Sequence, residues 1–102
     1  MSEPIEIIDD TENSRFVYRE DGVDAQLVYE GDGDRLVLVH TEVPKALGGR
    51  GIGGALVRAA VDRAAASGET VAPWCSYTRK WLEDRADEAS RIAIDWAPPP
   101  QR

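Results

Sequence analysis

Glycine dominates the segment Val43-Pro44-Lys45-Ala46-Leu47-Gly48-Gly49-Arg50-Gly51-Ile52-Gly53-Gly54-Ala55-Leu56-Val57. Residues 36–39, which precede it, are apolar on both faces of an extended chain, as expected for a strand buried in a sheet. The apolar residues that follow recur at spacings of three and four up to Ser67, which predicts an amphipathic helix. The first backbone N–H groups of a helix have no partner within it. A glycine loop at this point therefore predicts an anion-binding site.

Alternating apolar residues and turn signals predict the elements around this loop. Two strands, at 14–20 and 24–30, flank Asp21-Gly22, a hairpin signal because glycine tolerates positive φ. A third strand over 35–43 ends at Pro44, which cannot donate to a ladder. The later elements are predicted as a helix at 51–67, a strand at 70–75 and a helix at 77–85.

This order of elements predicts an α/β (α+β) domain, in which an antiparallel meander is followed by a β-α-β-α unit in one compact mixed sheet. The strand-helix-strand portion over 35–75 should form a parallel, right-handed crossover. A length of 102 residues fits a single domain, which we place at 14–94. Residues 1–13 should be flexible or add an edge strand, for which 5–8 is the candidate. The Pro-rich tail over 95–102 should be disordered.

Composition narrows the classes of partner. The net charge of −7 argues against a nucleic-acid binder, which needs a basic face, and is compatible with a cationic partner such as an amine. The single cysteine allows no internal disulfide. The acidic N-terminus does not resemble a signal peptide, and no apolar stretch approaches the ~18 residues of a membrane helix. These features favour a cytoplasmic protein without membrane contact, and a monomer is slightly favoured.

Two well-known phosphate-binding patterns compete for the glycine loop. A P-loop needs Gly-Lys followed by Ser or Thr, which is absent. A dinucleotide fingerprint is met literally by Gly49, Gly51 and Gly54, with the acidic Glu69 further along. However, Glu69 precedes the next predicted strand, whereas a ribose-binding acid should follow it. The chain is also short for a doubly wound nucleotide domain, so this alternative is weak.

A third pattern is carried by several separated motifs. Gly51 and Gly53 occupy the glycine positions of Gln/Arg-x-x-Gly-x-Gly/Ala, although Gly48 stands where Gln or Arg is usual. With them occur His40-Thr41-Glu42-Val43-Pro44, Leu56-Val57-x-Ala59-Ala60 and Val71-x-Pro73-x-Cys75-x-Tyr77. Over about residues 14–85 the chain resembles the small, single-domain GCN5-related N-acetyltransferases (GNAT), of the NATD1 type. Residues 84–94 agree less well with that group.

The resemblance implies acetyl-CoA as cofactor, an amine as acceptor and no metal. It implies that the strand end at Val43 pairs with the pantetheine arm, and that the Val43 N–H polarises the thioester carbonyl. The phosphates would lie on the loop, where Arg50 could add a charge-assisted contact. The implied cofactor-binding residues are Val43, Gly48, Gly49, Arg50, Gly51, Ile52, Gly53 and Gly54.

Four residues are candidates for the chemistry. Cys75 ends a predicted strand just before a helix, a place that lowers a thiol pKa, so it is a nucleophile or else an inert core thiol. His40 and Glu42 share one face of their strand, with Thr41 facing the other way, and either could be the general base. Tyr77 resembles the tyrosine that protonates the departing thiolate in the family, or it simply packs in the core.

The sequence thus predicts an N-acetyltransferase that transfers acetyl to a small-molecule amine or a protein lysine, by direct attack or through Cys75. The alternative is an acyl-CoA-binding module without significant catalysis. A plain interaction domain is a third possibility, which would bind no CoA.

Overall fold

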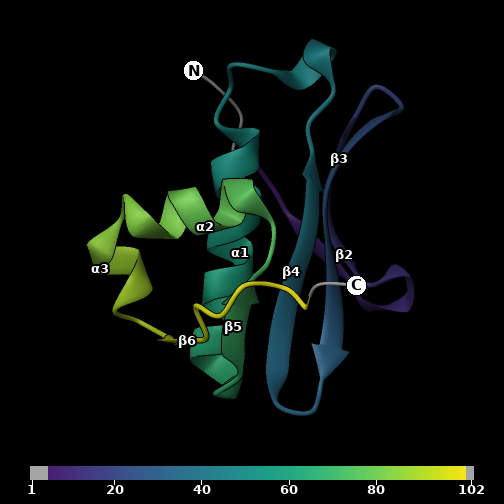
Figure 1. Cartoon of the computed structure of the whole chain (residues 1–102). Helices are drawn as coiled ribbons and strands as arrows, with labels where there is room; N and C mark the ends of the chain where they lie inside the picture. The colour runs from purple at the N-terminus through teal and green to yellow at the C-terminus, as the bar shows by residue number, and fades with distance from the viewer. Residues whose placement is uncertain (1–4, 101–102) are drawn as a thin grey trace.

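The computed structural model describes residues 5–100, and within them the strands form one six-stranded sheet (Figure 1). The elements, in chain order, are β1 (Ile8–Asp10), β2 (Arg15–Glu20), β3 (Val23–Asp32), β4 (Arg35–Glu42), α1 (Ile52–Ser67), β5 (Thr70–Pro73), α2 (Ser76–Glu83), α3 (Ala86–Ala89) and β6 (Ala93–Ile94), with short 3-10 helices at Thr11–Asn13 and Lys45–Leu47.

The strands lie in the sheet in the same order as in the chain. Strands β1 to β4 pair antiparallel through hairpins, whereas β5 pairs parallel with β4 and β6 pairs parallel with β5. The predicted antiparallel meander and the parallel crossover through α1 are therefore both confirmed.

Tight turns set the register of the meander. Asp21 and Gly22 both have positive φ, 51° and 77°, the conformation of a two-residue turn that matches strand twist. The second turn is equally short, because Asp32 pairs with Arg35 around Gly33, whose φ is 63°. This short turn lengthens β3 beyond the predicted range of 24–30.

Helix α1 supplies one half of the core. It begins after Gly51 and ends at Gly68, whose N–H donates to the carbonyl of Ala64 at 2.8 Å. The side chains that the helical spacing predicts as buried are fully buried against β2 to β5. They are Leu56, Val57, Ala60 and Val61, and they meet Phe16, Leu27, Leu36 and Leu38. Each such large side chain contributes about 1.5–3 kcal/mol by burial.

The N-terminal edge strand lies further along the chain than the sequence predicts. The sequence predicts an edge strand at 5–8, whereas β1 spans Ile8–Asp10 and pairs antiparallel with β2. Asp9 is held by the Tyr29 hydroxyl at 2.6 Å and by Arg63 at 3.1 Å. These two contacts join β1 to β3 and to α1.

The C-terminal part contains α3 and β6, which the sequence does not predict. After β6, the Asp95 N–H donates to the Val71 carbonyl at 2.8 Å, and the Asp95 carboxylate pairs with Arg35 at 2.8 Å. Arg79 donates to the Trp96 carbonyl at 2.9 Å. The first residues of the tail predicted as disordered therefore make defined contacts, and residues 101–102 lie outside the described range.

Candidate functional site

The glycine loop lies where β4 leaves the sheet and α1 begins. Leu47 is buried and anchors the 3-10 helix that precedes the loop. Gly49 and Gly51 have φ values of 76° and 78°, a region that residues with a Cβ avoid. This conformation presents the first N–H groups of α1, which have no partners within the helix, to the space in front of Ile52.

A cavity of about 370 Å³ opens in front of these N–H groups. Thr41, Leu47 and Tyr77 line it together with most of the predicted cofactor-binding residues. Those residues are Val43, Gly48, Gly49, Gly51, Ile52 and Gly53. Backbone donors, a helix N-terminus and glycines that leave room for a ligand suit a pyrophosphate, so the residues present fit the phosphate end of a cofactor such as CoA.

Arg50 does not point into this cavity. Its guanidinium nitrogens pair with both carboxylate oxygens of Glu20, at 2.5 and 2.9 Å, and the Tyr18 hydroxyl donates to the same carboxylate at 2.7 Å. Arg50 and then Tyr18 hold the pKa of Glu20 at about 2, well below its usual value. A phosphate in contact with the Arg50 side chain would therefore share its guanidinium with Glu20.

Strands β4 and β5 separate beside the cavity. Their pairing ends at Leu38 and Pro73, although β4 continues to Glu42. Strand β5 ends at Pro73, and the chain then bends so that the Cys75 N–H donates to the Leu38 carbonyl at 2.9 Å. The backbone of β4 beyond Leu38 thus faces a split in the sheet instead of a neighbouring strand.

A β-bulge in β4 decides which side chains face that split. Tyr29 pairs with Leu38 and Val28 pairs with His40, so Val39 is the extra residue. Because side chains alternate along a strand, one extra residue reverses the faces beyond it. Thr41 consequently lies on the helix-covered face that Leu38 occupies before the bulge.

Cys75 lies at the split, directly before α2. Its sulfur is 3.5 Å from the Thr41 hydroxyl. The N–H groups of Tyr77 and Thr78 face it from the first turn of α2, without the geometry of a regular cap. Burial raises the pKa of the Cys75 thiol, but the Thr41 hydroxyl and these N–H groups outweigh it and the pKa is lowered. A lowered pKa favours the thiolate, which is the nucleophilic form.

Tyr77 belongs to the same group of residues. It is 45% exposed and lines the cavity of the glycine loop. Its hydroxyl lies against the start of α1, since a Cβ built at Gly53 would be 2.7 Å from it. Tyr77 thus lines the cavity directly, whereas Cys75, from the same short segment, is joined to it through Thr41.

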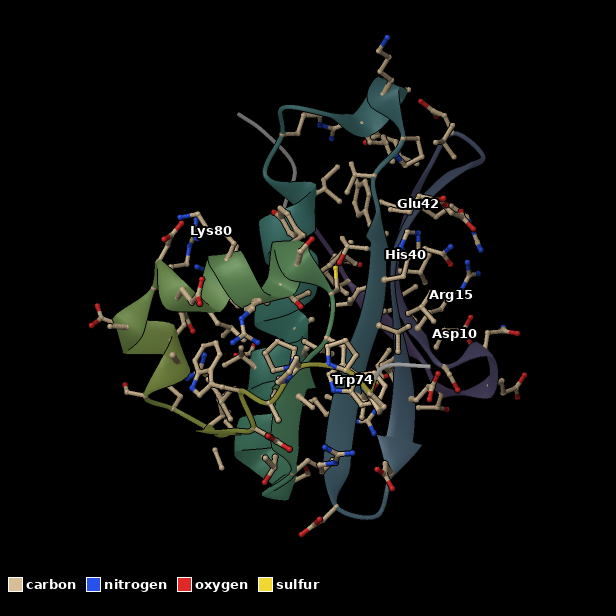
Figure 2. The ribbon with its side chains drawn as sticks, in the orientation of Figure 1. Asp10, Arg15, His40, Glu42, Trp74 and Lys80 are labelled. Atoms are coloured by element: carbon tan, nitrogen blue, oxygen red, sulfur yellow. The ribbon has the colours of Figure 1, made fainter. Side chains whose placement is uncertain are left out.

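His40 and Glu42 lie on the opposite face of the sheet. Figure 2 shows both side chains on the side of β4 away from α2, the helix that carries Lys80. The two side chains share a face as predicted, with 3.9 Å between His40 Nε2 and Glu42 Oε2. They are 60% and 59% exposed. The strand itself therefore separates these candidate bases from Cys75.

Two residues near the site are not predicted from the sequence to be functional. Thr41 is predicted only to face away from His40, and its contact with Cys75 depends on the bulge and on the bend after β5. Glu20, the partner of Arg50, ends β2 thirty residues earlier in the chain. No local pattern around Glu20 signals this pairing.

Comparison with known proteins gives the same result as the motifs. Residues 15–91 match the family described as GCN5-related N-acetyl-transferase. The chain belongs to the GCN5-related N-acetyltransferase family. Its relatives include Protein NATD1 of Gallus gallus, 37% identical over 84 residues that cover 79% of this chain and 76% of that protein. Protein NATD1 of Homo sapiens is also 37% identical over 84 residues, covering 79% of this chain and 74% of the relative.

The GNAT fold is shown independently by a solved structure. The solution NMR structure of a GCN5-like protein from Staphylococcus aureus superposes with a TM-score of 0.69, covering 90% of this chain and 92% of that one at 24% identity. The predicted family and fold class are thus confirmed, and membership of the GNAT family implies acetyl transfer.

Within residues 5–100 no cluster of three or more His, Cys, Asp or Glu is arranged to hold a metal ion. None of the helices in that part of the chain has the length and apolar character to cross a bilayer.

Proposed function

We propose that this GNAT protein is an acetyl-CoA-dependent N-acetyltransferase whose acceptor is the amine of a small molecule or of a protein lysine. The observation that supports this proposal most directly is the position of Cys75. The cavity of the glycine loop reaches Thr41, whose hydroxyl contacts the Cys75 sulfur at the split between β4 and β5. Thr41 therefore links the candidate anion site to the Cys75 thiol.

In this proposal the main chain binds the cofactor. The free N–H groups at the start of α1 hold its pyrophosphate, and Gly49 and Gly51 let it approach the backbone. Val43, which also lines the cavity, offers its N–H to the carbonyl oxygen where negative charge develops. When bound, acetyl-CoA supplies an acetyl group as an activated thioester.

The side chains move the protons. Glu42 or His40 accepts the proton of the acceptor ammonium, directly or through water, so that the neutral amine attacks the carbonyl carbon. Tyr77 donates a proton to the departing thiolate. In the route through Cys75, its thiolate first takes the acetyl group as a thioester, and the amine then displaces the Cys75 sulfur. The direct route omits that transfer and otherwise uses the same residues.

A transfer assay over an amine panel tests the proposal. Released CoA thiol and acetylated product are followed with polyamines, a lysine peptide and small amines. We expect at least one acetylated product, and for Cys75→Ala a fall in kcat of about a hundredfold or more with acetyl-CoA binding retained. Full activity in Cys75→Ala would exclude the route through the thiol. Binding without turnover for every amine would contradict the enzymatic function.

A further inference from the structure

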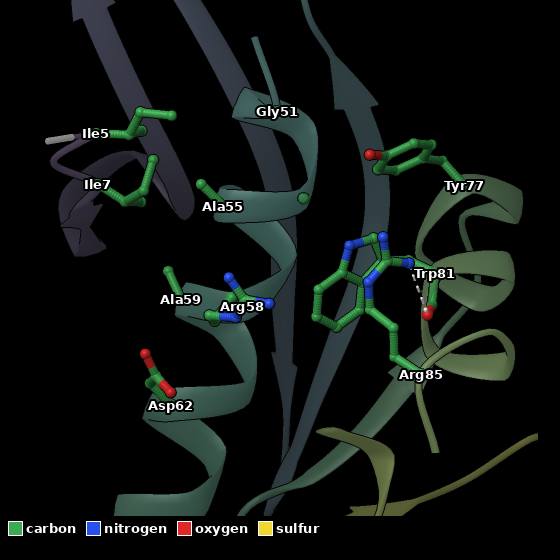
Figure 3. A pocket seen from close by; sticks show the side chains of 11 residues that line it. Ile5, Ile7, Gly51, Ala55, Arg58, Ala59, Asp62, Tyr77, Trp81 and Arg85 are labelled. Atoms are coloured by element: carbon green, nitrogen blue, oxygen red, sulfur yellow. Dashed lines mark hydrogen bonds between the residues drawn. The ribbon is translucent and has the colours of Figure 1, made fainter. Parts of the chain in front are cut away.

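A second and larger cavity lies along α1, between α2 and the segment before β1 that carries Ile5 and Ile7 (Figure 3). Its volume is about 720 Å³, and Gly51 and Tyr77 line both this cavity and the one in front of the glycine loop. Figure 3 shows Arg58 on α1 facing Trp81 and Arg85, which come from α2 and the residues after it. The cavity is thus a continuation of the candidate phosphate site along the side of α1.

Trp81 offers this cavity a free donor. The residue is only 4% exposed, yet its indole N–H makes no hydrogen bond within residues 5–100. In that part of the chain no fully buried side-chain nitrogen lacks a partner, so this N–H is open to the cavity. It is held close to α1 because Gly54 has no Cβ, which would lie 2.9 Å from the indole nitrogen.

Two guanidinium groups flank the same indole. The Cζ atoms of Arg58 and Arg85 lie 5.6 and 4.5 Å from the Trp81 ring centre, at cation–π distance, which orients both groups. Arg85 makes no ion pair among the described residues and donates only to the Trp81 carbonyl, at 3.4 Å. Arg58 pairs with Glu88 through Nε alone, at 3.1 Å, which leaves its terminal nitrogens free.

Two acidic groups of this region are already engaged. Asp62, which also lines the cavity, pairs with Arg91 at 2.8 Å, and Glu88 accepts from both Arg91 and Arg58. Although the chain carries a net charge of −7, the cavity therefore presents the guanidinium of Arg85, the terminal nitrogens of Arg58 and an N–H donor. This combination binds a phosphate group.

The spacing to the glycine loop suits one nucleotide. Arg58 lies ~9 Å along the axis of α1 from Ile52, at 1.5 Å per residue. Its side chain leans toward the N-terminus of the helix, which shortens that distance. A diphosphate on the first N–H groups and a second phosphate at Arg58 are then separated by about one sugar. Coenzyme A carries a 5′-diphosphate and a 3′-phosphate on one ribose.

Resting on the proposed acetyl-CoA dependence, we propose that Arg58, Arg85 and Trp81 bind the 3′-phosphate of the cofactor's ribose. The protein then selects 3′-phosphorylated cofactors over dephospho-CoA. The pyrophosphate contributes to binding in both compounds, whereas only CoA reaches these three side chains.

Isothermal titration with CoA and with dephospho-CoA tests this selection. For the unmodified protein we expect CoA to bind at least about tenfold more tightly, because charge-assisted hydrogen bonds are strong in a partly enclosed site. In the double variant Arg58→Gln/Arg85→Gln the ratio of the two affinities should fall close to one, with dephospho-CoA affinity nearly unchanged. Both arginines are exposed, so the variant should remain folded, which its melting curve checks.

Lys80→Gln is the matched control. It removes one positive charge from α2, but Lys80 pairs with Asp84 and does not line the cavity, so the preference should persist. Equal affinities in the unmodified protein, or a preference that survives in the double variant, would overturn the 3′-phosphate site and leave the proposed function standing. If neither compound binds the unmodified protein, the proposed function fails and this proposal fails with it.

Discussion

At position 75 two opposing effects act on one thiol. Burial favours the neutral form and raises the pKa of Cys75, whereas the Thr41 hydroxyl and the N–H groups at the start of α2 favour the thiolate. The second effect is larger, so the pKa lies below its ordinary value. As the pH rises, Cys75 should therefore become reactive at a lower pH than an ordinary cysteine.

Removing the hydroxyl tests this balance. In Thr41→Val the thiolate loses a hydrogen bond while the burial remains, so the pKa of Cys75 should rise and alkylation at neutral pH should slow. The rate of reaction with iodoacetamide, measured across neutral and alkaline pH, gives the midpoint of thiol ionisation for the parent and for Thr41→Val. Thr70→Val, at the other end of the β4–β5 pairing, is the control and should leave the midpoint unchanged. Coincident midpoints for Thr41→Val and the parent would contradict the assignment.

Two adjacent glycines of α1 should respond differently to alanine. A Cβ at Gly53 meets the hydroxyl end of the exposed Tyr77, which can move, so Gly53→Ala should keep its stability and weaken cofactor binding. A Cβ at Gly54 meets the buried Trp81, and overpacking of this kind costs about 1–3 kcal/mol. Alanine's better helix propensity offsets up to about 1 kcal/mol in each variant. Thermal melts should rank Gly54→Ala below Gly53→Ala, and the reverse order would contradict these contacts.

For individual residues, the sequence predicts which ones line the site better than it predicts their contacts with residues far away in the chain. Four of the predicted glycines and Val43 line the cavity of the site, whereas Gly54 lines only the neighbouring cavity beside α2. These positions are predictable because they follow from the local order of strand, loop and helix. The pairing of Arg50 with Glu20 is not predictable, because it joins residues far apart in the chain.

Among the elements, the strands of the meander and α1 follow from local patterns. Alternation, two-residue turns and helical spacing act within a few residues, so the bounds of α1 at 52–67 lie within one residue of the prediction. The bulge at Val39, by contrast, depends on how β4 pairs with β3 while β5 turns away. Elements as short as α3 and β6 carry no periodic signal and are held by tertiary contacts.

The end of α1 gives a prediction about an element. Gly68 caps the helix with a φ of 82°, whereas Gly31 in β3 has no positive φ, and a Cβ would meet no atom within 4 Å at either site. Gly68→Ala should destabilise the domain by about 1 kcal/mol, lowering Tm by roughly 4–8 °C. Gly31→Ala should be neutral or slightly stabilising. Equal melting temperatures for the two variants would show that the cap conformation carries no cost.

Over the whole molecule, the sheet separates two kinds of groups. The cavity of the glycine loop, Cys75 and Tyr77 lie with the helices, and the candidate bases His40 and Glu42 lie on the other face (Figure 2). Both groups adjoin the stretch of β4 that β5 has left. An acceptor that enters from the face of His40 and Glu42 would reach a thioester bound from the helical side.

This separation predicts that binding and turnover respond independently. The variant His40→Gln/Glu42→Gln should bind acetyl-CoA as the parent does and lose kcat by about a hundredfold, the usual size of a general-base contribution. Glu30→Gln, an exposed acid near the far end of β3, is the charge-matched control and should change neither value. Titration calorimetry and the transfer assay supply the two readouts. Weakened acetyl-CoA binding, or undiminished turnover, would contradict a role for this pair as the base.

Every proposal above depends on binding of acetyl-CoA at the glycine loop, which a thermal melt with and without acetyl-CoA measures. At one hundred times the dissociation constant, binding adds ~2.7 kcal/mol, and each kcal/mol raises the midpoint by roughly 4–8 °C in a domain of this size. Gly51→Glu places a carboxylate at the anion site, while Gly33→Glu places one at a distant turn glycine that also has positive φ. We expect a saturable rise in Tm for the parent and for Gly33→Glu, and a strongly reduced rise for a folded Gly51→Glu. No rise in the parent at millimolar acetyl-CoA would contradict binding at the glycine loop.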